Sequence, residues 1–403
     1  MPSFARSLTP VRIVTIIACG LIAFYIGALA ALFHNDPGWL IDKSGQPRTN
    51  EYVGVRAAGM LALEGKAADA YDWSLHRVAE AEITGAPVKN YFAWPYPPSY
   101  LPVAVALASL PLLPSALLWI AATLALYAWS IVRISGVRGA GVWALASPAS
   151  FINAYVAHTG FWTAGVMGLA LEALETRPIL AGVLFGALTM KPQLGLLIPV
   201  ALIAGGYWRV MGSAVAAALS AALISIAAFG VDPWLQLIPQ MARISDHVRD
   251  GNVIMELLVT LYGFLRALGV PHVPALIAQC TLSLVLAAGV FKLWRSDAPL
   301  PLKAAALASA SMLVSPYMFV YDLTHLSIAI AFLIRYCGLG GLTKIEVATM
   351  AASMAMILGL AIVQMPLGFL ANVHIGAIML GRVRPYLRPA GALAFNQARP
   401  MAL

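Results

Sequence analysis

Long apolar stretches joined by short basic links fill most of this chain. Of its 403 residues, 61% are hydrophobic and only 10% are charged, whereas soluble domains carry about 25% charged residues. A chain this apolar cannot cover itself with polar groups, so we expect its solvent to be lipid. The net charge of +8 does not indicate a nucleic-acid partner, because the basic residues are spread among the links and form no single patch.

The apolar runs predict an all-α, polytopic integral membrane protein with about 11–13 transmembrane or re-entrant helices in the lipid bilayer. We divide the chain into a cytoplasmic N-terminus (1–10), a first transmembrane helix (11–33), an external loop (34–95), a multi-helix membrane domain (96–381) and a cytoplasmic tail (382–403). A second external loop is expected at 231–270. The apolar runs of the membrane domain lie at 96–112, 114–132, 140–157, 161–174, 179–190, 194–206, 210–229, 273–292, 303–315, 322–336, 345–364 and 368–381.

Basic residues at the ends of the runs predict the orientation of the chain. The first run follows Arg6 and includes Arg12, and we interpret it as a retained transmembrane helix with its N-terminus in the cytoplasm. A cleaved signal peptide is the alternative. From residue 175 onward the links that we assign to the cytoplasm hold Arg177, Arg209, Lys292, Arg295, Lys303, Arg335 and Lys344.

The number of crossings upstream of residue 175 poses a problem. Counting every run between 96 and 174 as a full span would leave the loop 34–95 on the wrong side of the membrane. Either the run 96–112 is therefore re-entrant, or two of the runs within 140–174 count as one.

Helical periodicity predicts two short surface helices within the first external loop. They cover Glu51–Glu64 and Tyr71–Thr84 and end at Gly65 and Gly85, which are natural C-terminal caps. Glu51 would lie in the first turn of its helix, where the helix dipole favours an ionised carboxylate. Such a carboxylate could take a proton from a hydroxyl group, or it could be a helix-stabilising residue paired with Arg56.

Three further polar groups interrupt apolar sequence. The segment Lys191-Pro192-Gln193 lies between two short predicted helices. A lysine inside the membrane is energetically costly unless its ammonium group meets an anion, such as a lipid phosphate, or extends to the membrane interface. Tyr321 and Asp322 begin another run, and Asp322 could orient a substrate, pair with Lys191 or be an ordinary N-terminal acid of a helix. His158 could line the same cavity, or it could be a satisfied buried histidine.

The remaining clusters are less specific. Tyr96 lies in the segment Trp94–Pro98, whose prolines and aromatic rings suit a membrane interface. The external segment Asp246–Asp250 mixes carboxylates with a histidine but lacks the spacing of metal ligands, so we expect no metal.

Together these clusters resemble the polyprenyl-phosphate-sugar-dependent glycosyltransferases of family 87, bacterial GT-C enzymes often described as mannosyltransferases. The resemblance runs from about Val11 to Arg384. It is carried by Asn50-Glu51-Tyr52-Val53, Ala57-Ala58-Gly59, Leu61-Ala62-Leu63-Glu64-Gly65, Ala70-Tyr71-Asp72-Trp73, Trp94-Pro95-Tyr96-Pro97-Pro98, Leu180-Ala181-Gly182, Phe185-Gly186, Lys191-Pro192-Gln193, Ser315-Pro316-Tyr317 and Tyr321-Asp322-Leu323.

The resemblance implies a membrane hexosyltransferase that takes its sugar from a polyprenyl phosphate sugar donor and needs no other cofactor. The acceptor would be a glycan, a glycolipid or a protein, and the active site would face the periplasm or the outside of a bacterial inner membrane. By this resemblance Glu51 acts as the base of an inverting displacement. Lys191 and Arg56 would stabilise the departing phosphate, and Gln193, Tyr321, Asp322, His158 and Tyr96 would bind substrate.

The chain departs from the family pattern at two positions. The base of such families is usually an aspartate followed by phenylalanine, where this chain has Glu51-Tyr52, and relatives tend to have Gln-Asn-Gly where it has His158-Thr159-Gly160. Altered acceptor geometry, a base role for Asp42 or Asp36, and weak catalysis are the alternatives.

Two other classes of function remain open at this point. A secondary transporter or lipid flippase would also use broken helices, but it predicts internal repeats that the sequence does not show. A non-catalytic relative of the family is the third reading.

Overall fold

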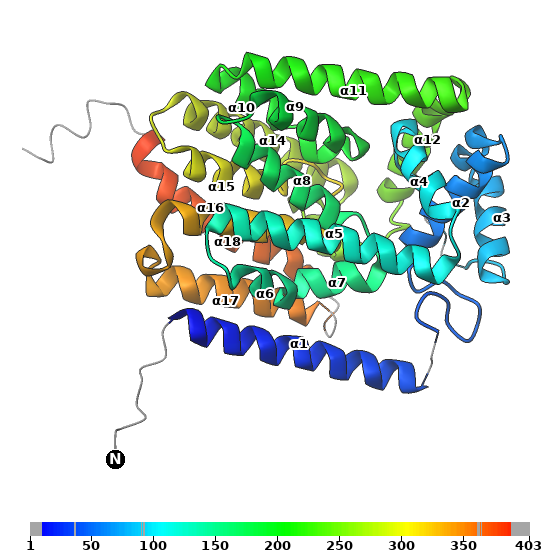
Figure 1. Ribbon diagram of the computed structural model, residues 1–403, viewed down its shortest axis with the longest axis horizontal. Helices are drawn as coiled ribbons and strands as arrows, with labels where there is room; N and C mark the ends of the chain where they lie inside the picture. Colours follow the sequence, from blue (N-terminus) through cyan, green and yellow to red (C-terminus); the bar gives the residue numbers. More distant parts are fainter. Residues whose placement is uncertain are drawn as a thin grey trace, which may run out of the picture.

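The computed structural model describes residues 10–35, 38–89, 91, 93–360, 363 and 365–387 of the chain. These residues form eighteen α-helices joined by short 3-10 turns (Figure 1), and the β-pairing among them is limited to two isolated bridges. The all-α class predicted from the apolar runs is confirmed. The helices are α1 (Pro10–Asn35), α2 (Asn50–Leu63), α3 (Trp73–Thr84), α4 (Leu101–Ala108), α5 (Leu112–Ser135), α6 (Ala140–Ala146), α7 (Pro148–Val156), α8 (Gly160–Ala173), α9 (Pro178–Ala187), α10 (Ile198–Gly205), α11 (Trp208–Phe229), α12 (Asp232–Arg249), α13 (Leu261–Ala267), α14 (His272–Arg295), α15 (Leu300–Ser311), α16 (Thr324–Cys337), α17 (Lys344–Gly359) and α18 (Leu367–Leu387).

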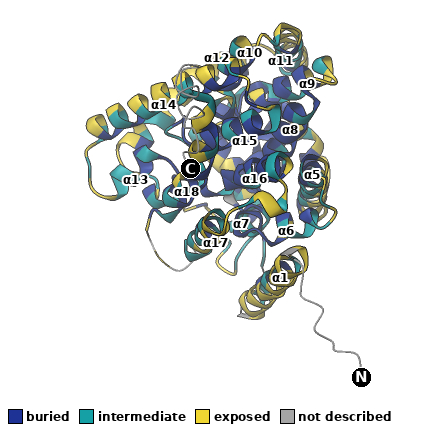
Figure 2. Ribbon diagram, turned by 90° about the vertical axis from the view of Figure 1, so that its left-hand side faces the viewer, coloured by how far each residue is buried: buried dark blue, intermediate teal, exposed yellow. Residues whose placement is uncertain are grey.

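Most of the long helices run side by side along one direction and form a bundle. The central helices α8, α15 and α16 are buried, whereas α1, α11 and α14 lie at the outside and expose apolar side chains (Figure 2). Five helical segments of the described chain are long and apolar enough to cross a bilayer: Val11–His34, Leu112–Ser135, Trp208–Phe229, His272–Arg295 and Val320–Cys337. An outer surface of exposed large apolar side chains suits lipid as solvent, and the chain is a multi-pass membrane protein.

The two ends of the bundle differ in composition. The start of α1 and the end of α18 lie at one end, and α2, α3 and α4 lie at the other (Figure 1). The end that holds the start of α1 and the end of α18 carries Arg133 in the last turn of α5, Arg335 in the last turn of α16 and Arg384 in the last turn of α18. Two ion pairs tie helices together there, Arg133 with Glu172 at 2.9 Å and Arg382 with Glu346 at 2.6 Å.

Two of the predicted apolar runs upstream of residue 175 contain only short helices. The run at 96–112 contains α4, which has eight residues and is therefore roughly 12 Å long, far short of the ~30 Å hydrocarbon core. It packs against α2 and cannot span a bilayer. The run at 140–157 is divided at Pro148 into the short helices α6 and α7, because proline removes a backbone donor and begins a new helix.

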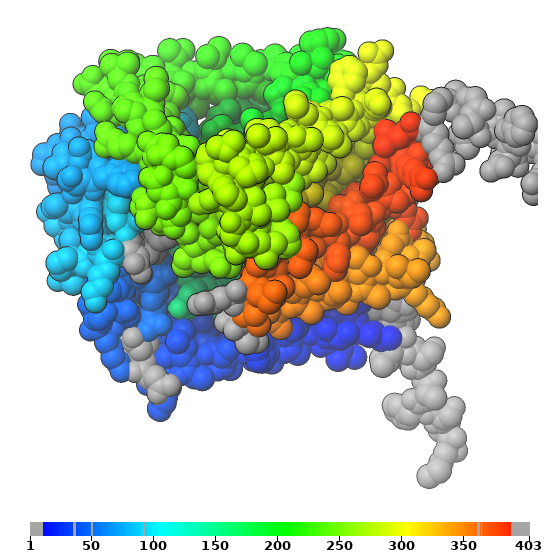
Figure 3. Space-filling view, turned by 180° about the vertical axis from the view of Figure 1, so that it is seen from behind, coloured from blue at the N-terminus to red at the C-terminus, as the bar shows by residue number. Residues whose placement is uncertain are grey.

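The segment predicted as a second external loop, 231–270, contains two helices. Pro233 stands in the first turn of α12, where a missing N–H has no cost. Polar residues recur along this helix at helical spacing, as at Gln236, Gln240 and Arg243. The sequence therefore held the signal of an amphipathic helix, and the expectation of a loop was wrong here. Seen from behind, α12 lies beside α2 and α3 at the same end of the molecule (Figure 3).

The two predicted surface helices are observed as α2 and α3, with small shifts. Asp72 caps α3 by accepting hydrogen bonds from the backbone N–H of Ser74 and of Leu75, so this helix begins at Trp73 and not at Tyr71. Gly85 ends it in the left-handed conformation, as predicted. Thr49 occupies the cap position of α2, but its side chain makes no capping hydrogen bond.

Gly59 is where α2 approaches α4 most closely. A methyl group at this position would lie 2.2 Å from the carbonyl oxygen of Ala104 and 2.8 Å from Cβ of Ala108. We expect Gly59→Ala to push the two helices apart and to lower the free energy of unfolding by about 1–3 kcal/mol, measured as a fall in thermal midpoint in lipid nanodiscs. Gly212→Ala in α11, where no atom lies within 4 Å of the added methyl, is the matched control. Equal midpoints for the two variants would contradict this packing account.

Candidate active site

A cavity opens at the end of the bundle where α2, α3 and α12 meet. Its volume is about 220 Å³, and it is open to the outside. Its walls come from segments far apart in the sequence. The lining residues used below are Glu51, Trp73, Tyr91, Tyr96, His158, Lys191, Gln193, His247, Tyr317, Phe319 and Tyr321.

Glu51 enters the cavity from the first turn of α2. The Tyr321 hydroxyl donates to Glu51 Oε1 at 3.4 Å, and His158 Nε2 lies 3.4 Å from Glu51 Oε2. Burial raises the pKa of Glu51, but His158, Lys191 and the Tyr321 hydroxyl lower it by more, so the pKa lies below its usual value. This carboxylate is therefore ionised at neutral pH and able to accept a proton.

His158 is presented by a break between α7 and α8. Ala157 adopts the left-handed conformation with φ 52°, and Asn153 Oδ1 accepts a hydrogen bond from the Gly160 N–H at 3.0 Å, which closes the break. The imidazole stacks on the Tyr321 ring with centroids 3.5 Å apart, and its Nε2 lies 3.2 Å from the Tyr96 hydroxyl. The ring is thus held against the base by contacts on several sides.

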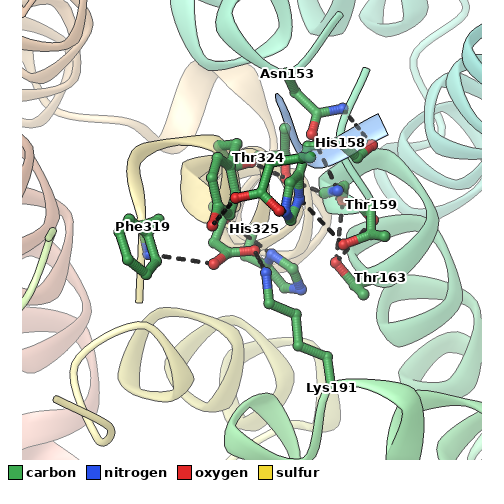
Figure 4. A network of polar contacts seen from close by, with 12 residues as sticks. Asn153, His158, Thr159, Thr163, Lys191, Phe319, Thr324 and His325 are labelled. Atoms are coloured by element: carbon green, nitrogen blue, oxygen red, sulfur yellow. Dashed lines mark hydrogen bonds and ion pairs between the residues drawn. The ribbon is translucent and has the colours of Figure 1, made fainter. Parts of the chain in front are cut away.

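Lys191 reaches the same network from the break after α9 (Figure 4). Its Nζ lies 2.6 Å from Asp322 Oδ1 and 4.8 Å from the centroid of the Tyr321 ring. Asp322 is fully buried, and its second oxygen accepts from the Phe319 N–H at 3.3 Å. An ammonium group has three hydrogens, so Lys191 can hold Asp322 and still donate to an anion in the cavity.

The site combines one acidic and one basic side chain around a common space. Among the described residues that line the cavity, Glu51 is the sole carboxylate and Lys191 the sole lysine or arginine. A carboxylate of this kind can act as a general base. A cation in a partly dry site can stabilise negative charge that develops on a leaving group.

The structure brings most of the predicted site residues together. Six of them line the cavity, and Asp322 lies directly behind its wall in the ion pair with Lys191. The six are Glu51, Tyr96, His158, Lys191, Gln193 and Tyr321.

Arg56 and the alternative bases do not join this group. The Arg56 guanidinium donates to the carbonyl oxygens of Leu107 and Leu110, at 3.2 Å and 2.5 Å, and the residue does not line the cavity. Asp42 accepts hydrogen bonds from Ser44 and Gln46 within its own turn. Asp36 lies outside the described residues.

The aromatic part of the cavity was missed from the sequence. Trp73, Tyr91 and His247 form one wall, and Tyr317 and Phe319 form part of another. Trp73 and Tyr317 each lie within a motif that carries the family resemblance, which was a usable signal. Nothing in the sequence singled out Tyr91, because its position depends on how the loop after α3 folds back.

A second pair of titratable groups lies buried behind Glu51. His76 Nε2 lies 3.0 Å from the Gly54 carbonyl of α2, and this oxygen can only accept, so we assign the proton to Nε2. His76 Nδ1 then accepts from the Tyr91 hydroxyl at 3.1 Å. Burial lowers the pKa of His76 to about 4, which keeps the ring neutral. His76 therefore ties α3 to the turn of α2 that follows Glu51.

Glu80, one turn further along α3, makes stability depend on pH. Burial and the nearby charge of Glu51 raise its pKa from 4.5 to about 8. The folded chain thus retains a proton that the unfolded chain has released, so this group lowers stability as pH rises from 4.5 to 8. His76, with a lowered pKa, acts in the opposite direction only up to its ordinary value of 6.5.

We therefore expect Glu80→Gln to reduce the fall in thermal midpoint between pH 6.5 and 8. The measurement is thermal unfolding in nanodiscs at several pH values. Glu82→Gln, on the exposed face of the same helix, serves as the control. If the thermal midpoint fell by the same amount between pH 6.5 and 8 in wild type and in Glu80→Gln, the raised pKa assigned to Glu80 would be contradicted.

Comparison with known proteins bears on the middle of the chain. The model of glycosyltransferase family 87 matches residues 94–316, which is more than half of the chain. No curated protein and no solved structure matches it. The matched range contains Tyr96, His158, Lys191 and Gln193, whereas Glu51 and the pair Tyr321–Asp322 lie outside it. A multi-pass helical protein with an acid and a cation in one cavity fits such an enzyme, and the match shows that the chain belongs to glycosyltransferase family 87.

Proposed function

We propose that this glycosyltransferase moves a hexose, with mannose favoured, from a polyprenyl phosphate sugar to an acceptor at the external face of the membrane. The observation that carries the proposal is that Glu51 and Lys191 open onto one cavity. A base and a phosphate-binding cation must both face the anomeric carbon, and residues on separate surfaces could not do so.

The proposed reaction is a single inverting displacement. Glu51 takes the proton of the acceptor hydroxyl, and the freed oxygen forms a bond to the anomeric carbon. The bond between that carbon and the phosphate oxygen breaks, and its electron pair leaves with polyprenyl phosphate. The departing phosphate gains negative charge beside Lys191, which stabilises it.

The ion pair with Asp322 stabilises the buried Lys191 side chain and fixes its position for this role. The carboxylate gives the ammonium group a partner in a buried place where an isolated charge would be costly. It also holds the side chain over the Tyr321 ring, so the cation is positioned before substrate arrives. In this proposal Tyr321 and Asp322 shape the donor end of the cavity, and Gln193 lines it.

The proposed orientation follows from the distribution of charge. The end that carries Arg133, Arg335 and Arg384 would face the cytoplasm, because basic residues are retained on that side. The cavity lies at the opposite end, beside α2, α3 and α12. It would then face the periplasm or the outside of a bacterial inner membrane.

An assay of polyprenyl phosphate release tests the proposal. Purified protein in nanodiscs would receive polyprenyl phosphates that carry mannose, glucose or arabinose, together with a mixture of candidate acceptors. We expect release with the mannose donor to exceed release with the other two. Movement of the intact donor between leaflets without release would support a flippase, and no reaction of any donor would support a non-catalytic relative.

A further inference from the structure

Three aromatic rings form one wall of the cavity. Trp73 begins α3, Tyr91 follows that helix, and His247 lies in the last turn of α12. The Trp73 ring lies 5.8 Å from that of Tyr91 and 5.4 Å from that of His247, centroid to centroid. We call these three residues the aromatic wall. Its members come from elements other than those that carry Lys191.

The polar atoms of two of these rings are held away from any ligand. Trp73 Nε1 donates to Gln240 Oε1 at 2.6 Å, and the buried Gln240 in turn donates to the Trp94 carbonyl at 3.2 Å. The Tyr91 hydroxyl donates a hydrogen bond to His76 Nδ1 at 3.1 Å. Both rings are therefore fixed in place, and what they offer to the cavity is apolar ring surface.

His247 supplies a polar edge to the same wall. Within the described part of the chain, its ring nitrogens make no hydrogen bond, although the residue is half-buried and lines the cavity. A ligand at this wall would thus meet two rigid apolar ring surfaces with one free hydrogen-bonding group beside them.

This combination matches the shape of a pyranose, which has a face of C–H bonds and a rim of hydroxyl groups. A peptide side chain that carries a hydroxyl lacks such a face. Resting on the proposed function, we propose that the aromatic wall binds the pyranose ring of a carbohydrate acceptor, with Trp73 as the residue that selects it. The ring would lie on the indole with a hydroxyl directed toward Glu51, in the cavity that both residues line.

Two variants of Trp73 separate ring contact from structural support. Trp73→Phe keeps an aromatic surface but loses the hydrogen bond to Gln240, and Trp73→Leu loses both. Trp129→Leu, on the exposed surface of α5 and outside the cavity, controls for the loss of an indole elsewhere. Saturation-transfer NMR with a panel of methyl hexopyranosides would measure binding to each full-length protein in nanodiscs.

We expect at least one glycoside of the panel to bind wild type, Trp129→Leu and Trp73→Phe with affinities within about threefold, and Trp73→Leu about tenfold or more weakly. In the release assay, Trp73→Leu should raise the acceptor KM by a similar factor and leave the donor KM unchanged. A threonine peptide should not replace the glycoside.

Other outcomes overturn the inference or the proposed function separately. Absence of glycoside binding to wild type, or an equal loss in Trp73→Phe and Trp73→Leu, would overturn the carbohydrate site. Glycoside binding that is lost in Trp73→Leu, together with no release of polyprenyl phosphate from any donor, would support the wall and contradict the proposed function.

Discussion

Replacement of Glu51 by glutamine is expected to lower kcat for sugar transfer by about 10²–10⁴-fold, the usual contribution of a general base. Glutamine has nearly the same shape and can still accept from the Tyr321 hydroxyl, but it cannot take a proton. The donor KM should change little, because in the proposed mechanism Lys191, and not Glu51, binds the donor phosphate. The measurement is the release of polyprenyl phosphate under donor saturation, with wild type and variant at equal folded concentration.

Glu51→Asp is the matched control for this variant. It keeps the charge and shortens the side chain by one methylene, and a displacement of about 1 Å can cost on the order of a hundredfold. We expect Glu51→Asp to retain more activity than Glu51→Gln, and its pH profile to keep the acid limb of a carboxylate. Because the pKa of Glu51 is lowered, the wild-type rate should stay level across neutral pH and fall only below the ordinary carboxyl value of 4.5. Unchanged activity in Glu51→Gln would remove the base assignment.

Replacement of Lys191 by methionine is expected to harm both stability and rate. It leaves Asp322 buried without its partner, and breaking a buried pair in this way costs about 3–5 kcal/mol. The rate should fall by about 10²–10³-fold, because the departing phosphate loses its cation. Thermal unfolding in nanodiscs and the release assay measure the two effects separately.

The double variant Lys191→Met/Asp322→Asn distinguishes the two roles of the lysine. With both charges removed, the thermal midpoint should recover most of the loss, because no unpaired charge remains buried. The release rate should stay low, since no cation faces the phosphate. If the release rate recovered together with the thermal midpoint, the role of Lys191 would be structural and not catalytic.

The site residues that could be predicted from the sequence are mainly the charged residues that interrupt apolar, membrane-spanning sequence. Lys191 and Asp322 stood out because charged groups are costly within apolar sequence, and the pairing named as one alternative for Asp322 is observed at 2.6 Å. Glu51 stood out as the acid in the first turn of a helix beside the membrane. Confirmation that these groups share a cavity required the structure, because α2 and α9 are distant in the chain.

Other features depended on packing that the sequence does not reveal. The aromatic wall assembles from α3 and α12, and neither segment carries a pattern that indicates the other. Arg56 was grouped with the phosphate site because it lies close to Glu51 in sequence, yet its guanidinium turns to the carbonyls at the end of α4. Glu51 and Arg56 are five residues apart in α2, and at 3.6 residues per turn this spacing places the two side chains about 140° apart around the helix axis.

The two positions at which the sequence departs from the pattern expected by resemblance, Glu51 and His158, lie next to each other in the structure. His158 Nε2 lies 3.4 Å from Glu51 Oε2, so the two residues form one contact in the cavity. This contact holds the Glu51 carboxylate beside the His158 ring at the cavity wall.

A structure with a bound donor analogue tests the central claim most directly. The analogue would be a polyprenyl phosphonate in which carbon replaces the oxygen between mannose and phosphorus, and cryo-electron microscopy of the protein in nanodiscs would locate it. We predict a phosphonate oxygen within about 4 Å of Lys191 Nζ, a salt-bridge distance, and an anomeric carbon that faces the Glu51 carboxylate across the same cavity. A phosphonate bound away from Lys191, or a sugar outside the space that Glu51 faces, would contradict the account.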